Sequence, residues 1–226
     1  MPTEELDPGD GVRPLDVDCS ADVRAVVSMH EAHFPEATEV RCGPRFMTRF
    51  YFPFLIRRGW MGCLVARRDG RIVAYLTYTK FPRRILKAAA RARPLYVLWN
   101  VALACLTRFD AIRAITKHAR AAFQPSAASG APTIPPDAGE VLFLAAMPEH
   151  QTWTPPGGDA RVTARLFAEA QNRFRAEGVS RVLLVVRKTN TASMLFCHSM
   201  GCSIDKTASH PVYHHFWHDI PEVDEA

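Results

Sequence analysis

The segment from Gly139 to Arg175 constrains the fold of this chain more than any other. Its first part, EVLFLAAM, is a nearly continuous apolar run, which is typical of a strand buried on both faces. Further on, apolar residues recur at four-residue spacing, which predicts a helix: Val162, Leu166, Ala170 and Phe174. We therefore expect an α/β protein with a strand–loop–helix unit at its centre.

The loop of this unit ends in Gly157 and Gly158, directly before the predicted helix. The first turn of a helix offers N–H groups and the positive end of a dipole, and glycines let an anion approach the backbone closely. The pattern predicts a phosphate site. Asp159 could instead cap the helix by accepting hydrogen bonds from the same amides.

The run EVLFLAAMPEHQ (140–151), followed by GGDA (157–160), resembles the acetyl-CoA-binding core of the GCN5-related N-acetyltransferases (GNAT). In that family a strand precedes a pyrophosphate loop and a helix. The resemblance implies that acetyl-CoA binds along the strand and at the loop, through Leu144, Ala145, Ala146, Met147, Gln151, Gly157, Gly158 and Ala160. The free main-chain N–H groups beside the thioester are expected from residues 144–147.

A second stretch, NTASMLFCHSMG (190–201), follows a strand-like run and is similar to the GNAT element N-x-x-A-x-x-F-Y-x-x-x-G-F. That element forms a short helix beside the thioester, which implies that Asn190, Ser193 and Phe196 also contact acetyl-CoA. Cys197 stands where the family often has a tyrosine that protonates the departing thiolate. Cys197 is therefore a candidate acid, and His198 and Tyr213 are alternatives.

Transfer to an amine also needs a base that removes a proton from the ammonium group. Glu140 is the leading candidate, because it lies six residues before Ala146, the spacing that the histone-acetylating branch of the family uses. A carboxylate at the start of an apolar strand accepts a proton more readily than one in water. His214 or His215 could serve instead, since imidazole titrates near neutrality.

The C-terminal region holds four histidines, at 210, 214, 215 and 218. Neighbouring residues in a strand point to opposite faces, and no carboxylate or cysteine accompanies these histidines at ligand spacing. We expect no metal. The six cysteines show no CxxC spacing, and the acidic, polar N-terminus does not resemble an export signal, so we expect a reducing cytoplasm.

The chain of 226 residues has a net charge of +5, and its basicity is concentrated in one segment. Residues 80–123 contain ten Lys or Arg and one Asp. Within them lies PLYVLWNVALACLTRF (94–109), which is shorter than the roughly 20 residues that a membrane-spanning helix needs. Interleaved aromatics typical of a stacking surface are missing, so we expect no nucleic-acid partner.

Two interpretations of this insertion, residues 80–138, stay open. It can be a helical element that packs on the core or forms a homodimer contact. Alternatively, residues 81–123 can touch a membrane surface or cover a lipid-linked acceptor, because Arg and Lys flank Leu, Trp and Phe. In the second case the protein would be membrane-peripheral.

The order of predicted elements completes the resemblance to the GNAT family. It implies one domain over residues 1–226 with a mixed, mostly antiparallel twisted sheet of six to seven strands flanked by helices, an α/β (α+β) fold. The insertion would lie between strands three and four. The implied function is transfer of an acetyl group from acetyl-CoA to a primary amine. That amine would belong to a small molecule or to a lipid-linked acceptor. The alternative is a GNAT-like binding or membrane-peripheral module with weak catalysis.

Overall fold

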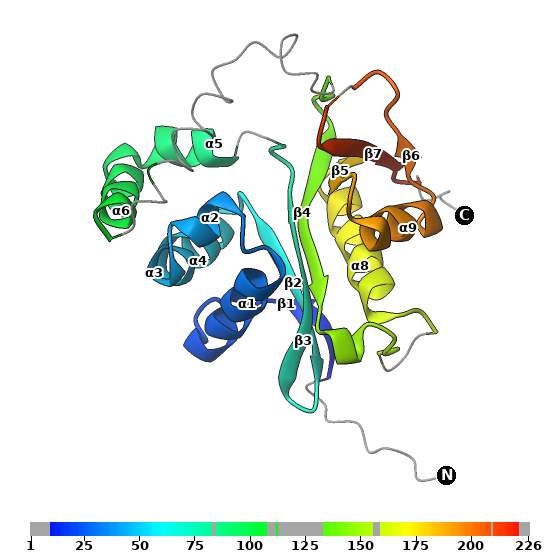
Figure 1. Cartoon of the computed structure of the whole chain (residues 1–226), viewed down its shortest axis with the longest axis horizontal. Helices are drawn as coiled ribbons and strands as arrows, with labels where there is room; N and C mark the ends of the chain where they lie inside the picture. Colours follow the sequence, from blue (N-terminus) through cyan, green and yellow to red (C-terminus); the bar gives the residue numbers. More distant parts are fainter. Residues whose placement is uncertain are drawn as a thin grey trace.

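A twisted seven-stranded sheet separates two groups of helices in the computed structural model of the chain (Figure 1). The structure describes residues 10–82, 85–107, 112, 133–155, 159–208 and 210–221. The strands are β1 (Gly11–Pro14), β2 (Gly62–Arg68), β3 (Arg71–Thr79), β4 (Ala138–Ala146), β5 (Arg181–Arg187), β6 (Ser203–Ile204) and β7 (Tyr213–Asp219). Their order in the sheet is β1-β2-β3-β4-β5-β7-β6.

All neighbouring strands are antiparallel except β4 and β5, which are parallel. The predicted mixed, mostly antiparallel sheet is thus confirmed. Asp69 and Gly70 join β2 to β3 with φ angles of 51° and 70°. Positive φ at both central residues is what a two-residue hairpin turn requires.

Helices cover both faces of the sheet (Figure 1). One group lies on the first face: α1 (Ser20–His33), α2 (Thr38–Arg41), α3 (Pro44–Phe46), the π-helix η1 (Met47–Tyr51) and α4 (Phe52–Arg57). The other face carries α8 (Val162–Ala176) and α9 (Thr191–Ser199). Each group packs on its own apolar core, and we call the two sides of the sheet the α1 face and the α8 face.

The insertion between β3 and β4 contains two helices, α5 (Ile85–Ala92) and α6 (Pro94–Thr107). This confirms a helical insertion at the predicted place. The described part of the chain excludes residues 83–84 and most of residues 108–132. The predicted basic segment after residue 109 and the predicted linker up to residue 132 therefore lie outside it.

Two glycines near the starts of β2 and β4 leave room for aromatic rings. A Cβ atom on Gly62 would lie 2.2 Å from the ring of Tyr78, and one on Gly139 would lie 2.3 Å from the ring of Phe174. The two rings meet edge to face, with centroids 5.1 Å apart. The rings therefore fill the space above the glycines and hold α8 against the sheet.

This packing predicts the effect of Gly139→Ala. The added methyl group would overlap Phe174, so we expect the free energy of unfolding to fall by about 1–3 kcal/mol in urea denaturation. In a Phe174→Leu background the same substitution should cost less, because the clashing ring edge is gone. An equal cost in both backgrounds would contradict the proposed overlap.

Candidate functional site

β4 and β5 part midway along their length. They pair only from Ala138–Arg181 to Val141–Leu184, although β4 continues to Ala146 and β5 to Arg187. On its other side, β4 has a bulge: Val141 lies opposite Tyr78 and Phe143 opposite Thr77, so Leu142 is an extra residue. A bulge bends its strand. Residues 142–146 of β4 therefore have no strand partner on the β5 side, and we call this side the open edge.

Two main-chain N–H groups face the open edge. The N–H of Met147 donates to the carbonyl oxygen of Val73 in β3 at 2.9 Å, so it is not free. Because hydrogen-bonding directions alternate along a strand, the N–H of Ala145 also faces β3, whereas those of Leu144 and Ala146 face the open edge. The expected set of four amides is thereby reduced to these two.

The helix that follows, α8, begins close to the open edge. Val162 packs in the same core as Leu144, Ala146 and Trp153. The N–H of Val162 donates to the carbonyl oxygen of Trp153 at 2.8 Å, which closes the intervening loop onto the helix. Gly157 and Gly158, the predicted diphosphate contacts, lie outside the described residues.

The first turn of α8 carries no acidic side chain. Its N-cap is Arg161, whose side chain makes no capping hydrogen bond, so the alternative in which Asp159 is the N-cap is wrong. Since the first four N–H groups of a helix lack intrahelical acceptors, those of Thr163 and Ala164 remain as donors for a ligand. Gln151 and Ala160 lie in the same loop, and Gln151 is exposed. This end of α8 can attract an anion.

The third element predicted to contact acetyl-CoA is α9, and its start is capped by the residue directly before it. The side chain of Asn190 accepts a hydrogen bond from the N–H of Ser193 at 3.0 Å. The ring of Phe196 meets that of Phe167 in α8 edge to face at 5.7 Å. Asn190 and Ser193 thus set the start of α9, and Phe196 fixes it to α8.

Cys197 is almost fully buried in the core of the α8 face. A hydrogen bond with the thiol of Cys202, followed by burial, raises the pKa of Cys197, while the same hydrogen bond lowers the pKa of Cys202. A thiol whose pKa is raised holds its proton more tightly. This environment weakens Cys197 as a candidate acid.

Glu140 and His214 lie on opposite faces of the sheet. Glu140 is 9% exposed and is next to Val141, which packs in the α8-face core, so its side chain is on the α1 face. The pKa of Tyr51 on that face is raised, first by burial and then by the negative charges of Glu39 and Glu140. His214 contacts Phe216 on the α8 face. The two side chains cannot serve one acceptor from the same side.

His215 and Tyr213 share the α1 face with Glu140, because residues alternate along β7. Tyr213 lies opposite Arg187 at the end of β5, and a hydrogen bond joins them. Arg187 also forms an ion pair with Glu36 at 2.5 Å. The loop between α1 and α2 is thereby tied to the end of β5 on the face of Glu140.

A buried polar cluster behind β4 was not predicted. His30 of α1 is fully buried, its Nδ1 is 2.7 Å from the Tyr75 hydroxyl, and its Nε2 is 3.2 Å from Glu39 Oε1. Tyr75 is the register partner of Ala145, and the ring of Phe143 lies 4.5 Å from His30. The cluster therefore supports β4 beside the open edge. The available signal was a histidine at an apolar position of the helix pattern of Val23, Val26 and Val27.

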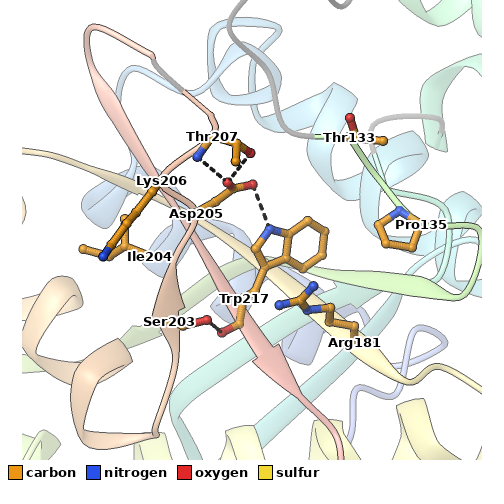
Figure 2. Close-up of a pocket in the computed structure, with 9 residues that line it drawn as sticks. All are labelled: Thr133, Pro135, Arg181, Ser203, Ile204, Asp205, Lys206, Thr207 and Trp217. Carbon is orange, nitrogen blue, oxygen red and sulfur yellow. Dashed lines mark hydrogen bonds between the residues drawn. The ribbon is translucent and has the colours of Figure 1, made fainter.

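A hollow of about 480 Å³ lies at the start of β5, beside Arg181 (Figure 2). Its carboxylate, Asp205, accepts hydrogen bonds from Thr207 and from Nε1 of Trp217. Arg181 lies over the ring of Trp217 and pairs with Asp219 at 2.8 Å. These polar groups bind one another, which indicates a structural role in holding β6 and β7.

No group of three or more His, Cys, Asp or Glu side chains in the described residues could hold a metal ion. In the same part of the chain, no helix combines the length and apolarity that crossing a membrane requires.

Several solved structures that are similar to this chain are described as acetyltransferases. An N-acetyltransferase from Staphylococcus aureus Mu50 is 10% identical with a TM-score of 0.55, covering 94% of this chain and 99% of that one. YncA of Salmonella typhimurium, a putative acetyltransferase solved with acetyl-CoA, is 13% identical with a TM-score of 0.54 and 95% coverage of both chains. PaiA N-acetyltransferase of Thermoplasma acidophilum, solved with coenzyme A, is 11% identical with a TM-score of 0.53, covering 92% and 98%.

Sequence comparison gave no relatives: no family model and no curated protein matches the chain. The similarity is therefore one of fold. Other matching structures include the GNAT domain of S. lividans PAT, at 16% identity and a TM-score of 0.50, covering 92% of this chain and 89% of that one.

Proposed function

We propose that this chain, which has the fold of the GNAT acetyltransferases, transfers an acetyl group from acetyl-CoA to a primary amine. The observation that carries the proposal is the open edge of β4 with the start of α8 beside it. Acetyl-CoA supplies the acetyl group as a thioester. The small side chains of Ala145 and Ala146 leave room along the strand, and the first turn of α8 offers donors for a diphosphate.

Each step of transfer has a candidate group on this chain. Glu140 accepts a proton from the acceptor ammonium on the α1 face, directly or through water. The N–H groups of Leu144 and Ala146 donate to the carbonyl oxygen as it gains negative charge. Tyr213, which lies on the same face as Glu140, replaces Cys197 as the preferred acid for the leaving sulfur, because burial and Cys202 hold the Cys197 proton.

The proposed acceptor is a primary amine on a small molecule or a lipid. Glu140 places a carboxylate on the α1 face, which suits an approaching cation. All six cysteines are free, which supports a reducing cytoplasm as the compartment.

Thermal unfolding with acetyl-CoA tests the proposal. A ligand that binds only the native state stabilises it by about 2.7 kcal/mol at a hundredfold excess over Kd, so a clear rise in Tm is expected. Acetyl-pantetheine, which lacks the diphosphate, should raise Tm much less if the start of α8 binds that group. CoA release should then be measured across a panel of primary amines. An unchanged Tm would refute the proposal, and a raised Tm without CoA release from any amine would favour the binding-module alternative.

A further inference from the structure

The insertion carries an uncovered apolar surface. Five large side chains of α6 lie on one side of the helix, and we call them the apolar stripe: Leu95, Leu98, Trp99, Leu103 and Leu106. Their exposed fractions are 81%, 64%, 68%, 37% and 85%. Five such residues on one 14-residue helix are more than the scattered exposed apolar side chains of an ordinary surface.

The opposite side of α6 is firmly attached to the protein. Val97 and Val101 pack against the core of the α1 face. The ring of Tyr96 lies 4.8 Å from that of Phe54, and its hydroxyl is 3.4 Å from the carbonyl oxygen of Arg49. Figure 1 shows α6 at the periphery of the molecule, beyond α3 and α4. The apolar stripe therefore faces away from the protein, because the other side of α6 packs against the core of the α1 face.

The chain segments that carry and adjoin the stripe are basic. The sequence has no Asp or Glu from Lys80 to Phe109, nor from Val40 to Arg68, the segment that includes α3 and α4 beneath α6. Arg91 in the last turn of α5 and Arg93 just before α6 are exposed, and among the described residues they form no ion pair. An apolar stripe flanked by basic residues complements a partner surface that has an apolar layer beneath negatively charged groups.

We propose that the apolar stripe of α6 and the adjacent arginines dock this protein on an anionic lipid bilayer. α6 would lie in the plane of the interface, with leucines and the indole of Trp99 in the acyl boundary and Arg91 and Arg93 among the headgroups. A second copy of the chain fits less well. A helix about 21 Å long offers less area than the roughly 800 Å² per partner of a standard interface. Two copies would also bring like charges together.

The docking geometry has a consequence for the acceptor. α6 packs on the core of the α1 face, which is also the face of Glu140. A bilayer on the stripe would lie toward the acceptor side, so a lipid-borne amine would reach the site without leaving the membrane. This consequence rests on the proposed function, whereas docking itself does not.

Vesicle flotation of the full chain tests the docking. The protein should float with phosphatidylcholine vesicles that contain phosphatidylglycerol and much less with phosphatidylcholine alone. Leu98→Gln with Trp99→Gln should reduce partitioning by more than about tenfold, because two large apolar side chains leave the interface. Arg91→Gln with Arg93→Gln should reduce binding to the anionic vesicles by about tenfold or more. Leu195→Gln, on α9 and equally exposed at 65%, is the matched control and should change nothing.

A spectroscopic readout separates insertion from loose adsorption. The indole emission should shift to shorter wavelength with anionic vesicles, and Trp99→Phe should remove this shift while the protein still floats. Vesicle binding needs no amine or acetyl-CoA, so its outcome is independent of the acetyltransferase test. The proposal is overturned if the chain does not float, if Leu195→Gln matters as much as the stripe variant, or if sedimentation shows a dimer that Leu98→Gln with Trp99→Gln dissociates.

Discussion

Replacing Glu140 by glutamine is expected to lower kcat/KM for acetyl transfer at neutral pH by about 100- to 1,000-fold. General base catalysis by a positioned side chain contributes roughly 10²–10⁴-fold, and an amide cannot accept the proton of an ammonium group. The effect should be largest below the pKa of the amine, where most of the acceptor is protonated. Turnover measured by CoA release across pH gives both the size of the loss and its pH dependence.

The structure offers a matched control for this test. Glu39→Gln removes another carboxylate from the α1 face, the one that pairs with His30. It should lower the stability of the α1 region but leave the pH profile of kcat/KM in place. Denaturation curves for both variants would separate loss of fold from loss of chemistry. If Glu140→Gln keeps full turnover near neutral pH, or if Glu39→Gln has the same effect on the pH profile, Glu140 is not the base.

Much of the fold could be predicted because the patterns are local. The turn at Asp69 and Gly70 needs two positive φ angles, and that dipeptide adopts them readily. The spacing of Val162, Leu166, Ala170 and Phe174 corresponds to the buried side of α8. Such signals depend on residues a few positions apart, so the sequence displays them directly.

The details of the open edge could not be predicted in this way. The run from Val141 to Ala146 is apolar without a period of two, so it does not show that Leu142 is an extra residue in a bulge. That bulge decides which amides face β5 and reverses the face on which the following side chains lie. The sequence therefore indicated the segment, whereas the choice of Leu144 and Ala146 over Met147 required the pairing with β3.

Long-range contacts limited the prediction of side-chain roles as well. Cys197 fits the family pattern by spacing, but its partner Cys202 and its burial follow from how α9 packs on the sheet. The sequence offers both Glu140 and His214 as the general base. Only the alternation of side chains along β4 and β7, whose strand partners are known, shows that the two lie on opposite faces of the sheet. His30 was missed because its partners, Tyr75 and Glu39, come from other elements.

Replacing Ala164 by glutamate should change stability and ligand binding in opposite directions. Ala164 is the third residue of α8, and the first turn there has no acidic side chain. A carboxylate at that position interacts favourably with the positive end of the helix dipole, typically by about 0.3–1 kcal/mol. The same charge would repel a diphosphate at the same N–H groups. We therefore expect a slightly higher Tm without ligand and an acetyl-CoA Kd raised by more than about tenfold, a loss of at least about 1.4 kcal/mol.

The matched control is Ala164→Gln, which adds nearly the same volume without the charge. If the start of α8 binds the diphosphate, Ala164→Gln should weaken acetyl-CoA binding far less than Ala164→Glu, and added salt should narrow the difference between them by screening. Acetyl-pantetheine should bind all three proteins alike, because it lacks the diphosphate. Equal weakening by glutamine and glutamate would indicate a steric effect. If Ala164→Glu does not weaken acetyl-CoA binding, the diphosphate does not bind at the start of α8. The proposal that the thioester lies at the open edge would then lose its main support.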